Sequence, residues 1–228
     1  MINSFLRTEL KNKVSEASNR IGIVVSEEQN EQLIQYLELL IKWNKAYNLT
    51  AIRDPEEMFI KHIVDSLSIA PFIKGESILD VGTGPGLPGI PMAIMFPSKH
   101  FSLLDSNGKK TRFLVQAKMS LALTNIEVFN VRVESLPSDK LFDQIMSRAF
   151  TALDNMVSLC KHLLASNGEF LAMKGLIPKD EIAMVDADYG IVSITPLIVP
   201  GCMDQRHLIT IKKIVNRSRI TLKRGMWW

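Results

Sequence analysis

From Glu76 onward, the sequence alternates short runs of β-branched and other apolar residues with segments of helical periodicity. The runs with the length and composition of strands are 77–81, 101–104, 126–131, 142–147 and 169–174. Segments 88–96, 109–123 and 152–164 have the periodicity of crossover helices, and Gly168 is typical of a helix stop. Strand, helix, strand repetition implies parallel neighbours, because each crossover returns the chain to the same edge. The sequence therefore predicts an α/β fold with a doubly wound, mostly parallel sheet.

Two later apolar runs follow a different pattern, because no helical segment lies between them. Residues 191–199 and 207–214 are separated by Pro200-Gly201, which is a strong turn signal. A short connection of this kind can join only antiparallel neighbours. We therefore expect an antiparallel pair of strands at the edge of the sheet.

The part of the chain that precedes the sheet has helical periodicity. Ser26 and Gln29 have the spacing of a capping box, which predicts a helix that ends near Tyr47. Asp54 and Pro55 provide the cap and the fixed φ with which a third helix begins. The expected inner face of that helix is Met58, Ile60, Ile63, Val64 and Leu67. We expect a small helical N-terminal segment over residues 1–74, a main domain over 75–215 and a C-terminal tail over 216–228.

Basic residues are concentrated near the C-terminus. Residues 205–228 hold seven of the 27 basic residues and no acid, so residues 1–204 hold 20 bases against 24 acids. Such a cluster fits contact with nucleic-acid phosphates, because neutralised phosphates release counterions. A solvated tail explains the same pattern. The candidate phosphate contacts in this region are Arg206, Lys212, Lys213, Arg217 and Arg219.

The remaining composition excludes several classes of protein. No apolar run approaches the roughly 20 residues that cross a bilayer. Residues 1–20 also lack the pattern of a secretion signal. Cys160 and Cys202 have neither metal-ligand spacing nor the density of a disulfide framework. We therefore expect a cytoplasmic protein with no membrane association and no metal site. A monomer is a separate expectation that these features do not determine.

The segment from Asp80 to Gly86, DVGTGPG, follows the first predicted strand, at the edge where ligands of doubly wound sheets bind. Gly82, Gly84 and Gly86 let the backbone turn sharply and approach a ligand where a Cβ would collide. Asp80 adds a negative charge at the strand end. That charge attracts a cofactor that carries a sulfonium and an ammonium, and it repels a phosphate. The loop therefore favours S-adenosyl-L-methionine as the cofactor.

A dinucleotide is the competing interpretation of the same loop. Residues 84–89 match the pattern GxGxxG, and an acidic residue lies downstream at a plausible distance. Against a dinucleotide, Pro85, Pro88 and Pro91 remove amide donors where a pyrophosphate would need them. The loop therefore indicates a methyl donor more strongly than a nicotinamide cofactor.

Asp105 follows the second predicted strand, so it should lie beside the glycine loop. A carboxylate there can accept hydrogen bonds from both ribose hydroxyls, which either cofactor would provide. The alternative role is a helix cap for the segment that begins near Asn107. Asp105 therefore supports a cofactor site without choosing between the two cofactors.

Several short segments together are more specific than the glycine loop. They are WNKAYNLT at 43–50, HIVDSL at 62–67, the stretch 80–91, SRA at 147–149, MKG at 173–175 and RHL at 206–208. In these segments, the chain resembles the bacterial glucose-inhibited division B proteins, which methylate N7 of a guanine in 16S ribosomal RNA, over nearly its whole length. The resemblance implies a Rossmann-like methyltransferase sheet with S-adenosyl-L-methionine as cofactor. It also implies 16S ribosomal RNA or the small ribosomal subunit as partner.

The resemblance further implies roles for individual residues. The implied contacts to the methyl donor are Gly82, Leu87, Val133, Glu134 and Arg148, of which Val133 and Glu134 border the adenine. Arg206 is implied to face the RNA. Lys174, at the end of the fifth predicted strand, can contact an RNA phosphate or be an ordinary lysine at the surface of the sheet. For Arg148, cofactor contact, RNA clamp and structural ion pair remain open.

The chemistry implied by guanine N7 needs no general base, because N7 has an available lone pair and loses no proton. Catalysis would then consist mainly of alignment and charge stabilisation, and we assign no catalytic residue. Enzymes that methylate exocyclic amines often carry Asn or Asp followed by two prolines after the fourth strand, whereas this chain has SRAF at residues 147–150, which argues against amine methylation. Carbon methylation of cytosine would need a cysteine nucleophile, and Cys160 lies in a helical segment well beyond Arg148, which argues against it. A nicotinamide-dependent oxidoreductase and a noncatalytic RNA-binding module are the alternative functions.

Polar residues in the first part of the chain have a structural and a functional interpretation. His62 and Asp65 lie one helical turn apart and can brace the junction between segments or touch substrate. Asn48 and Thr50 can fix the turn between the second and third helices through bonds to local backbone groups. Bracing is the expected role of His62 and Asp65.

Overall fold

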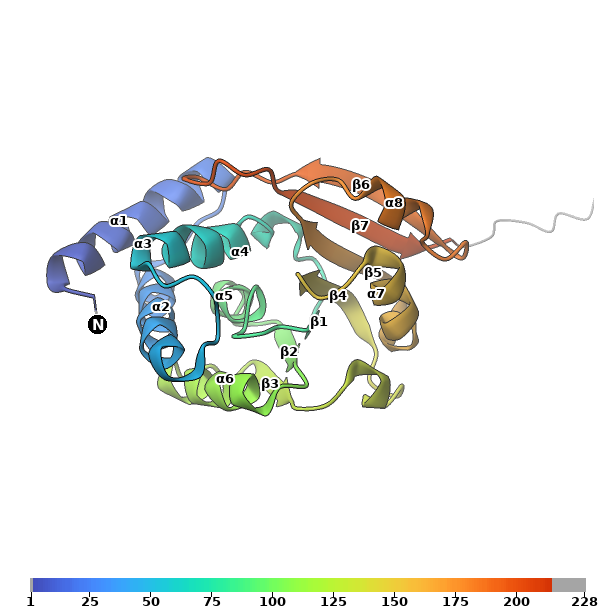
Figure 1. Cartoon of the computed structure of the whole chain (residues 1–228), viewed down its shortest axis with the longest axis horizontal. Helices are drawn as coiled ribbons and strands as arrows, with labels where there is room; N and C mark the ends of the chain where they lie inside the picture. Colours follow the sequence, from blue (N-terminus) through green and yellow to red (C-terminus); the bar gives the residue numbers. More distant parts are fainter. Residues whose placement is uncertain (1, 215–228) are drawn as a thin grey trace, which may run out of the picture.

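The computed structural model describes residues 2–214, and it contains the sheet expected from Glu76 onward (Figure 1). The strands are β1 (Ser77–Val81), β2 (His100–Leu104), β3 (Ile126–Phe129), β4 (Phe142–Arg148), β5 (Leu164–Lys174), β6 (Tyr189–Pro196) and β7 (His207–Lys213). They form one seven-stranded sheet in the order β3-β2-β1-β4-β5-β7-β6. The first five strands of this order are parallel, and β7 pairs antiparallel with β5 and with β6. The mostly parallel sheet and its antiparallel edge pair are therefore confirmed.

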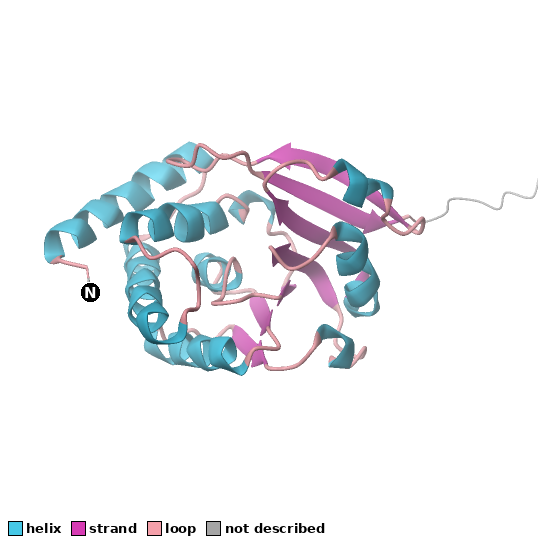
Figure 2. Ribbon diagram, viewed as in Figure 1, coloured by secondary structure: helices cyan, strands magenta, loops and turns pink. Residues whose placement is uncertain are grey.

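Helices lie along both faces of the sheet (Figure 2). The main α-helices are α1 (Ser4–Ile21), α2 (Glu27–Tyr47), α5 (Gly89–Met95), α6 (Gly108–Ser120), α7 (Leu153–Cys160) and α8 (Lys179–Ala183). The other helical segments are α3 (Pro55–Met58), the π-helical turn η1 (Phe59–Val64), α4 (Asp65–Leu67) and the 3₁₀ turns η2 (Ala70–Phe72), η3 (Val133–Ser135) and η4 (Lys161–Leu163). Among residues 2–214, every helix is too short or too polar to cross a bilayer.

Successive side chains of each central strand enter different cores, as the alternation of a strand requires. In β5, Leu171 and Met173 join the apolar cluster that includes α1, α2, α5 and α6. Phe170 and Ala172 join the second cluster, which includes α7. The central strands are therefore buried on both faces, which explains why their sequences are nearly continuously apolar.

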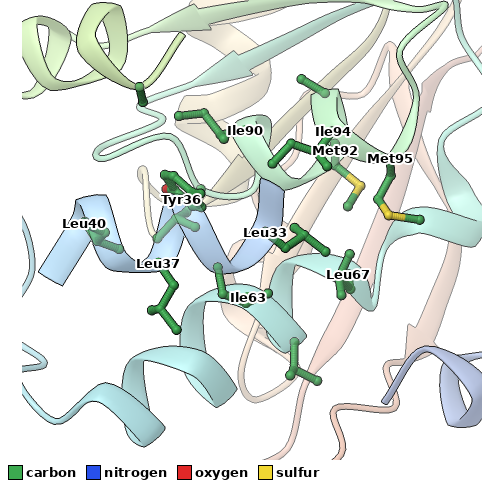
Figure 3. Close-up of a cluster of buried hydrophobic side chains, with 14 of the residues drawn as sticks. Leu33, Tyr36, Leu37, Leu40, Ile63, Leu67, Ile90, Met92, Ile94 and Met95 are labelled. Atoms are coloured by element: carbon green, nitrogen blue, oxygen red, sulfur yellow. The ribbon is translucent and has the colours of Figure 1, made fainter. Parts of the chain in front are cut away.

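The N-terminal helices pack directly on the sheet-covering helix α5. Figure 3 shows Leu33 and Leu37 of α2 and Ile63 of η1 in one cluster with Ile90 and Met92 of α5. All five side chains are buried, and each such burial stabilises the fold by about 1.5–3 kcal/mol. The capping box expected at the start of α2 is confirmed. The division of the chain at residue 74 stays a prediction, and residues 216–228 of the expected tail lie outside the described residues.

The third helix begins at Asp54 and Pro55 as expected, but a π-helical turn interrupts it. A π turn adds one residue per turn, so side chains beyond it point in different directions from those of a regular α-helix. Ile60, expected on the inner face, is only half-buried, whereas Phe59 and His62 are buried. The turn thus brings His62 and Asp65 inward, toward the carboxyl ends of β4 and β5.

The expectation that Gly168 ends a helix is wrong. The helical segment ends earlier, at Leu163, and Gly168 lies within β5. A Cβ added at Gly168 would lie 2.9 Å from the Asp143 carbonyl oxygen and 2.8 Å from Leu164 Cδ1. Close approach of β4, where the β4–β5 register shifts between Phe142 and Gln144, therefore explains the glycine.

Candidate active site

The glycine loop after β1 is held by hydrogen bonds from its own amides. The N–H of Thr83 donates to the Leu104 carbonyl at 3.0 Å, and those of Gly86 and Leu87 donate to the Thr83 carbonyl at 3.0 and 2.9 Å. The N–H of Gly84 donates to Asp105 Oδ2 at 3.0 Å. These four N–H groups therefore already donate to acceptors within the protein and are not free to bind a ligand. A pyrophosphate would need such donors, so the geometry argues against a dinucleotide.

The three loop glycines are required for different reasons. All have positive φ, with 66° at Gly82, 62° at Gly84 and 99° at Gly86. A Cβ at Gly82 would lie 2.4 Å from the Phe150 ring, and one at Gly86 would lie 2.5 Å from Ile90. A Cβ at Gly84 would meet nothing within 4 Å. Gly84 therefore leaves open space on the side where a ligand can approach, whereas Gly86 serves packing.

The Asp80 side chain lies beneath the loop and is fully buried. Its Oδ2 accepts hydrogen bonds from Thr83 Oγ1 at 2.6 Å and from the Gly89 N–H at 2.8 Å. Its Oδ1 is buried without a hydrogen-bond partner among the described residues. Burial raises the pKa of the Asp80 carboxyl to about 7, despite these two donors. Asp80 therefore holds the loop at Thr83 and at Gly89.

Asp105 is the second carboxylate that holds the glycine loop. Its Oδ2 accepts from Gly84, and its Oδ1 accepts from the Asn107 N–H at 2.8 Å. The helix-cap interpretation of Asp105 is wrong, because Asn107 is the N-cap of α6 and bonds the Lys109 N–H itself. Lys110 Nζ lies 3.5 Å from Asp105 Oδ2. Asp105 therefore joins the loops after β1 and β2 at the edge of a cavity.

The first of two cavities lies at the carboxyl ends of β1 to β4 and has a volume of about 390 Å³. Asp105 lines it from the end of β2, and Val133 and Glu134 line it from η3. Phe150, which follows β4, lines it as well. The cavity thus combines carboxylates with apolar walls, a combination suited to a nucleoside.

The second cavity has a volume of about 450 Å³ and shares the lining residues Gly82, Lys110 and Ala149 with the first. Gly84 and Leu87 of the glycine loop also line the second cavity. Its remaining polar lining is Thr50, Lys61, His62, Asp65, Thr83, Arg148, Lys174 and Arg206. The two cavities therefore meet at Gly82, and their linings differ in charge.

Asp65 joins two arginines from distant parts of the chain. Arg148 Nη1 lies 2.9 Å from Asp65 Oδ2, and Arg206 Nε lies 3.0 Å from Asp65 Oδ1. The Asp65 side chain is only 3% exposed, so its charge is compensated almost entirely by these partners. Arg148 also donates to the Lys61 carbonyl at 2.7 Å. Arg148 is therefore an ion-pair partner that also lines the second cavity.

Lys174 has a similar arrangement at the end of β5. Its Nζ lies 2.8 Å from Glu181 Oε2 and donates to the Thr151 carbonyl at 3.0 Å. A bridge to α8 thus holds the lysine at the rim of the second cavity. Expected roles of Lys174 and Arg206 toward RNA stay predictions, but both side chains line this cavity.

Helix α2 fixes the glycine loop from behind. The Tyr36 hydroxyl is buried and donates to the Pro85 carbonyl at 2.8 Å. Burial raises the pKa of Tyr36 above its ordinary value, so the hydroxyl keeps the proton with which it donates. The Gln29 side chain also donates to the last carbonyls of α5, Ile94 and Met95, at 3.2 and 3.0 Å. The N-terminal segment is therefore part of the loop's support.

Known proteins that resemble this chain match it over most of its length. The ribosomal RNA small subunit methyltransferase G of Enterobacter sp. (strain 638) is 53% identical over 201 residues, which cover 88% of this chain and 97% of that protein. The protein of the same name from Ectopseudomonas mendocina (strain ymp) is 52% identical over 202 residues, with 88% and 94% covered. Residues 29–209 match the family described as rRNA small subunit methyltransferase G. The chain belongs to this family. The resemblance to glucose-inhibited division B proteins is thereby confirmed.

Two solved structures with the same architecture are named as methyltransferases. The glycopeptide N-methyltransferase MtfA, solved with S-adenosyl-L-homocysteine, has a TM-score of 0.58 at 10% identity, covering 67% of this chain and 87% of that chain. A SAM-dependent methyltransferase from Aquifex aeolicus has a TM-score of 0.54 at 16% identity, covering 75% and 96%. At these identities, the likeness shows the fold alone. The Rossmann-like methyltransferase sheet of this methyltransferase G family member is confirmed.

Some of the expected phosphate contacts lie far from the cavities. Because β7 runs antiparallel to β5, Lys212 pairs with Glu169 in the middle of β5, whereas the cavities lie at the end of that strand, beside Met173 and Lys174. Lys212 Nζ lies 3.2 Å from Glu169 Oε2, and Lys213 is exposed beside it. Arg217 and Arg219 lie outside the described residues. Of the expected basic cluster, only Arg206 is thus placed at the cavities within residues 2–214.

The sequence analysis of this methyltransferase G family member missed Lys110, which lines both cavities. A signal for it existed. The first turn of α6 contains Lys109 and Lys110 and no acid, although the positive end of a helix dipole disfavours cations. Such a conflict with local preference is typical of a functional position.

Proposed function

We propose that this chain is a methyltransferase that transfers a methyl group from S-adenosyl-L-methionine to N7 of a guanine in 16S ribosomal RNA. Membership of the rRNA small subunit methyltransferase G family supports the reaction class and the kind of RNA. The observation that carries the proposal in the structure is the pair of cavities that meet at Gly82. One suits a nucleoside, and the other has a lining rich in basic side chains.

The residues present fit S-adenosyl-L-methionine. Gly84, where a Cβ would meet open space, leaves room for close approach to the loop. Asp105, Val133 and Glu134 would hold the adenosine in the first cavity. The amino-acid end would lie along the loop from Gly82 to Leu87, with the buried carboxylate of Asp80 beneath it. Arg148 lines the second cavity and is, in our proposal, shared between the cofactor and the target base.

The RNA would approach the second cavity. Lys174 and Arg206 stand at its rim and can contact phosphates on either side of the target nucleotide. Their acidic partners Glu181 and Asp65 keep them in place before RNA arrives. Lys212 and Lys213 would contact RNA farther from the target nucleotide, and Arg217 and Arg219, which lie outside the described residues, are also proposed to bind RNA. Such contacts add affinity without choosing the base.

The proposed reaction does not require a side chain that acts as a general base. When bound, the cofactor supplies an electrophilic methyl group on a sulfonium. Guanine N7 has an available lone pair, so none of the side chains at the second cavity has to remove a proton. His62 could not act as a strong base, because burial, followed by the charge of Arg148, lowers its pKa to about 4. The chain's contribution is therefore alignment of the base against the loop and exclusion of water.

Mapping of N7-methylguanosine tests the proposal directly. The 16S ribosomal RNA of cells with and without this protein should differ by one N7-methylguanosine. Purified protein and labelled S-adenosyl-L-methionine should restore that mark on RNA or on small subunits from the deficient cells. Identical methylation maps would refute the proposed function.

Asp80→Asn should affect stability and ligand binding in opposite directions. The pKa of the buried Asp80 is raised from 3.8 to about 7, so its ionisation is disfavoured in the folded protein. This destabilises the wild type increasingly as pH rises from the unfolded pKa to the folded one, and the effect levels off above it. The variant should therefore gain stability relative to the wild type between pH 4 and pH 7, by about 4 kcal/mol at most. It should nevertheless bind S-adenosylhomocysteine more weakly, because the ammonium group of the ligand loses its nearby carboxylate.

Chemical denaturation at a series of pH values and calorimetric titration of the ligand measure the two effects. Asparagine retains an oxygen that can accept from Thr83 and Gly89, so the loop keeps its support. A stability difference that is constant between pH 4 and pH 8 would contradict the raised pKa. Unchanged affinity would show that the Asp80 charge does not serve the ligand.

A further inference from the structure

The hydroxyl of Thr50 lies at the second cavity, and its protein neighbours leave it able only to donate a hydrogen bond to a ligand. The residue lies in the connection between α2 and α3 and lines the cavity together with Gly84 and Arg148. Its backbone is fixed, because the Thr50 N–H donates to Asn44 Oδ1 at 2.8 Å. The buried Asn44 side chain also donates to the Ile52 carbonyl at 3.1 Å. The hydroxyl is therefore held at a defined place in the cavity wall.

The neighbouring His62 determines which way the hydroxyl can bond. His62 Nδ1 faces Arg148 Nη2 at 3.4 Å, and a guanidinium can only donate. Burial lowers the pKa of His62 to about 4, so at neutral pH the ring carries a single proton. With Nδ1 as the acceptor, that proton is on Nε2. Nε2 lies 3.0 Å from Thr50 Oγ1 and therefore donates to it.

A second donor occupies the remaining acceptor position of the hydroxyl. The Ile52 N–H donates to Thr50 Oγ1 at 3.3 Å. A hydroxyl has two acceptor lone pairs and one proton. With both lone pairs used, Thr50 can only donate, and within residues 2–214 its proton has no protein acceptor. The second cavity thus presents a neutral, oriented donor that needs an acceptor on a ligand.

We propose that Thr50 Oγ1 donates a hydrogen bond to the 6-oxygen of the target guanine and so selects guanine over adenine. The inference rests on the proposed function, since it concerns the base that is methylated at N7. Guanine presents two adjacent acceptors on this edge, N7 and O6, whereas adenine presents N7 beside an amino donor. A donor beside the methylated nitrogen therefore pairs with guanine and opposes adenine. A neutral donor also suits the product, because N7 methylation leaves a positive charge on the base.

Thr50→Val removes the hydroxyl with little change in shape, and Thr50→Ser retains it as the matched control. Each protein is assayed for methyl transfer to 16S ribosomal RNA with guanine or 2-aminopurine at the target position. The RNA is used free or in assembled small subunits, whichever form the wild type methylates. 2-Aminopurine keeps N7 and the 2-amino group but lacks the 6-oxygen. Calorimetric titration of S-adenosylhomocysteine reports on the cofactor site separately.

We expect Thr50→Val to lower kcat/KM on guanine by about tenfold or more, since a site built to donate is left without its bond. The kcat/KM of the wild type should be lower on 2-aminopurine than on guanine by a similar factor. On 2-aminopurine, Thr50→Val should have the same kcat/KM as the wild type. Thr50→Ser should behave as the wild type on guanine, and all three should bind S-adenosylhomocysteine equally.

If Thr50→Val lowered kcat/KM by the same factor on guanine and on 2-aminopurine, the inference would be overturned. A purely structural role of Thr50, acting through His62 and Arg148, would lower the rate on both bases. Loss of S-adenosylhomocysteine binding, or an unchanged rate on guanine, would overturn it as well. A wild type that methylates neither base would instead refute the proposed function.

Discussion

Asp65→Asn should lower the free energy of unfolding by about 3 kcal/mol and methyl transfer by about 100-fold. The carboxylate is nearly fully buried and compensates both Arg148 and Arg206. Loss of its charge leaves two uncompensated cations facing each other at the second cavity, where we propose that the target base meets the methyl donor. The two arginines bond different oxygens of Asp65, and asparagine replaces one of these oxygens by an NH2 group that only donates, so one arginine loses its acceptor. Chemical denaturation and steady-state methylation of 16S ribosomal RNA measure the two effects.

The matched control is Asp186→Asn, which removes the charge from an exposed ion pair. Asp186 Oδ2 lies 3.1 Å from Lys161 Nζ, and the two side chains are 35% and 47% exposed. Exposed pairs contribute only about 0–1 kcal/mol, so stability should barely change. Methyl transfer should equal that of the wild type. Equal behaviour of the two variants would mean that the pairs of Asp65 do not support the site.

Gly82→Ala should lower the affinity for S-adenosylhomocysteine by about 100-fold. An alanine at φ 66° is strained by about 1–2 kcal/mol, and its Cβ would lie 2.4 Å from Phe150 Cδ2. Relief of that overlap costs a further ~1–3 kcal/mol and displaces the Phe150 ring or the loop. Both line the first cavity, so the strain falls on the cofactor site. Calorimetric titration measures the affinity.

Gly22→Ala separates backbone strain from damage to the site. Gly22 follows α1 with φ 82°, and a Cβ there would meet nothing within 4 Å. This variant should lose about 1–2 kcal/mol of stability but bind the ligand as the wild type does. If Gly82→Ala also bound with wild-type affinity, the proposed position of the cofactor beside Gly82 would be wrong.

The parts of the fold that were predicted correctly depend on local patterns. Strand and helix periods between β1 and β5 follow from the alternation of side chains, and the edge pair follows from the turn at Pro200-Gly201. The start of α2 follows from the capping box. Gly168 and Ile60 were misjudged because a strand irregularity and a π turn are set by neighbours that are distant in sequence.

The candidate site was predicted less completely than the fold. The position of the glycine loop at the sheet edge followed from its place after β1, and Asp105 was correctly placed beside it. The sequence alone left three roles open for Arg148 and suggested bracing for His62 and Asp65. Lys110, Tyr36 and the donor role of Thr50 were missed, because each depends on contacts made only after the chain has closed.

By itself, the sequence determined the doubly wound sheet, the edge that binds ligands and the methyltransferase family, since these follow from periodicity, glycine placement and short motifs. Only the tertiary structure decided that Asp65 pairs with Arg148 and Arg206, which are 83 and 141 positions away. It also decided that Lys212 pairs with Glu169 in the middle of β5, away from the cavities. Local rules govern dihedral angles and burial along a segment. Ion pairs and hydrogen-bond directions at a site depend on how distant segments meet in space.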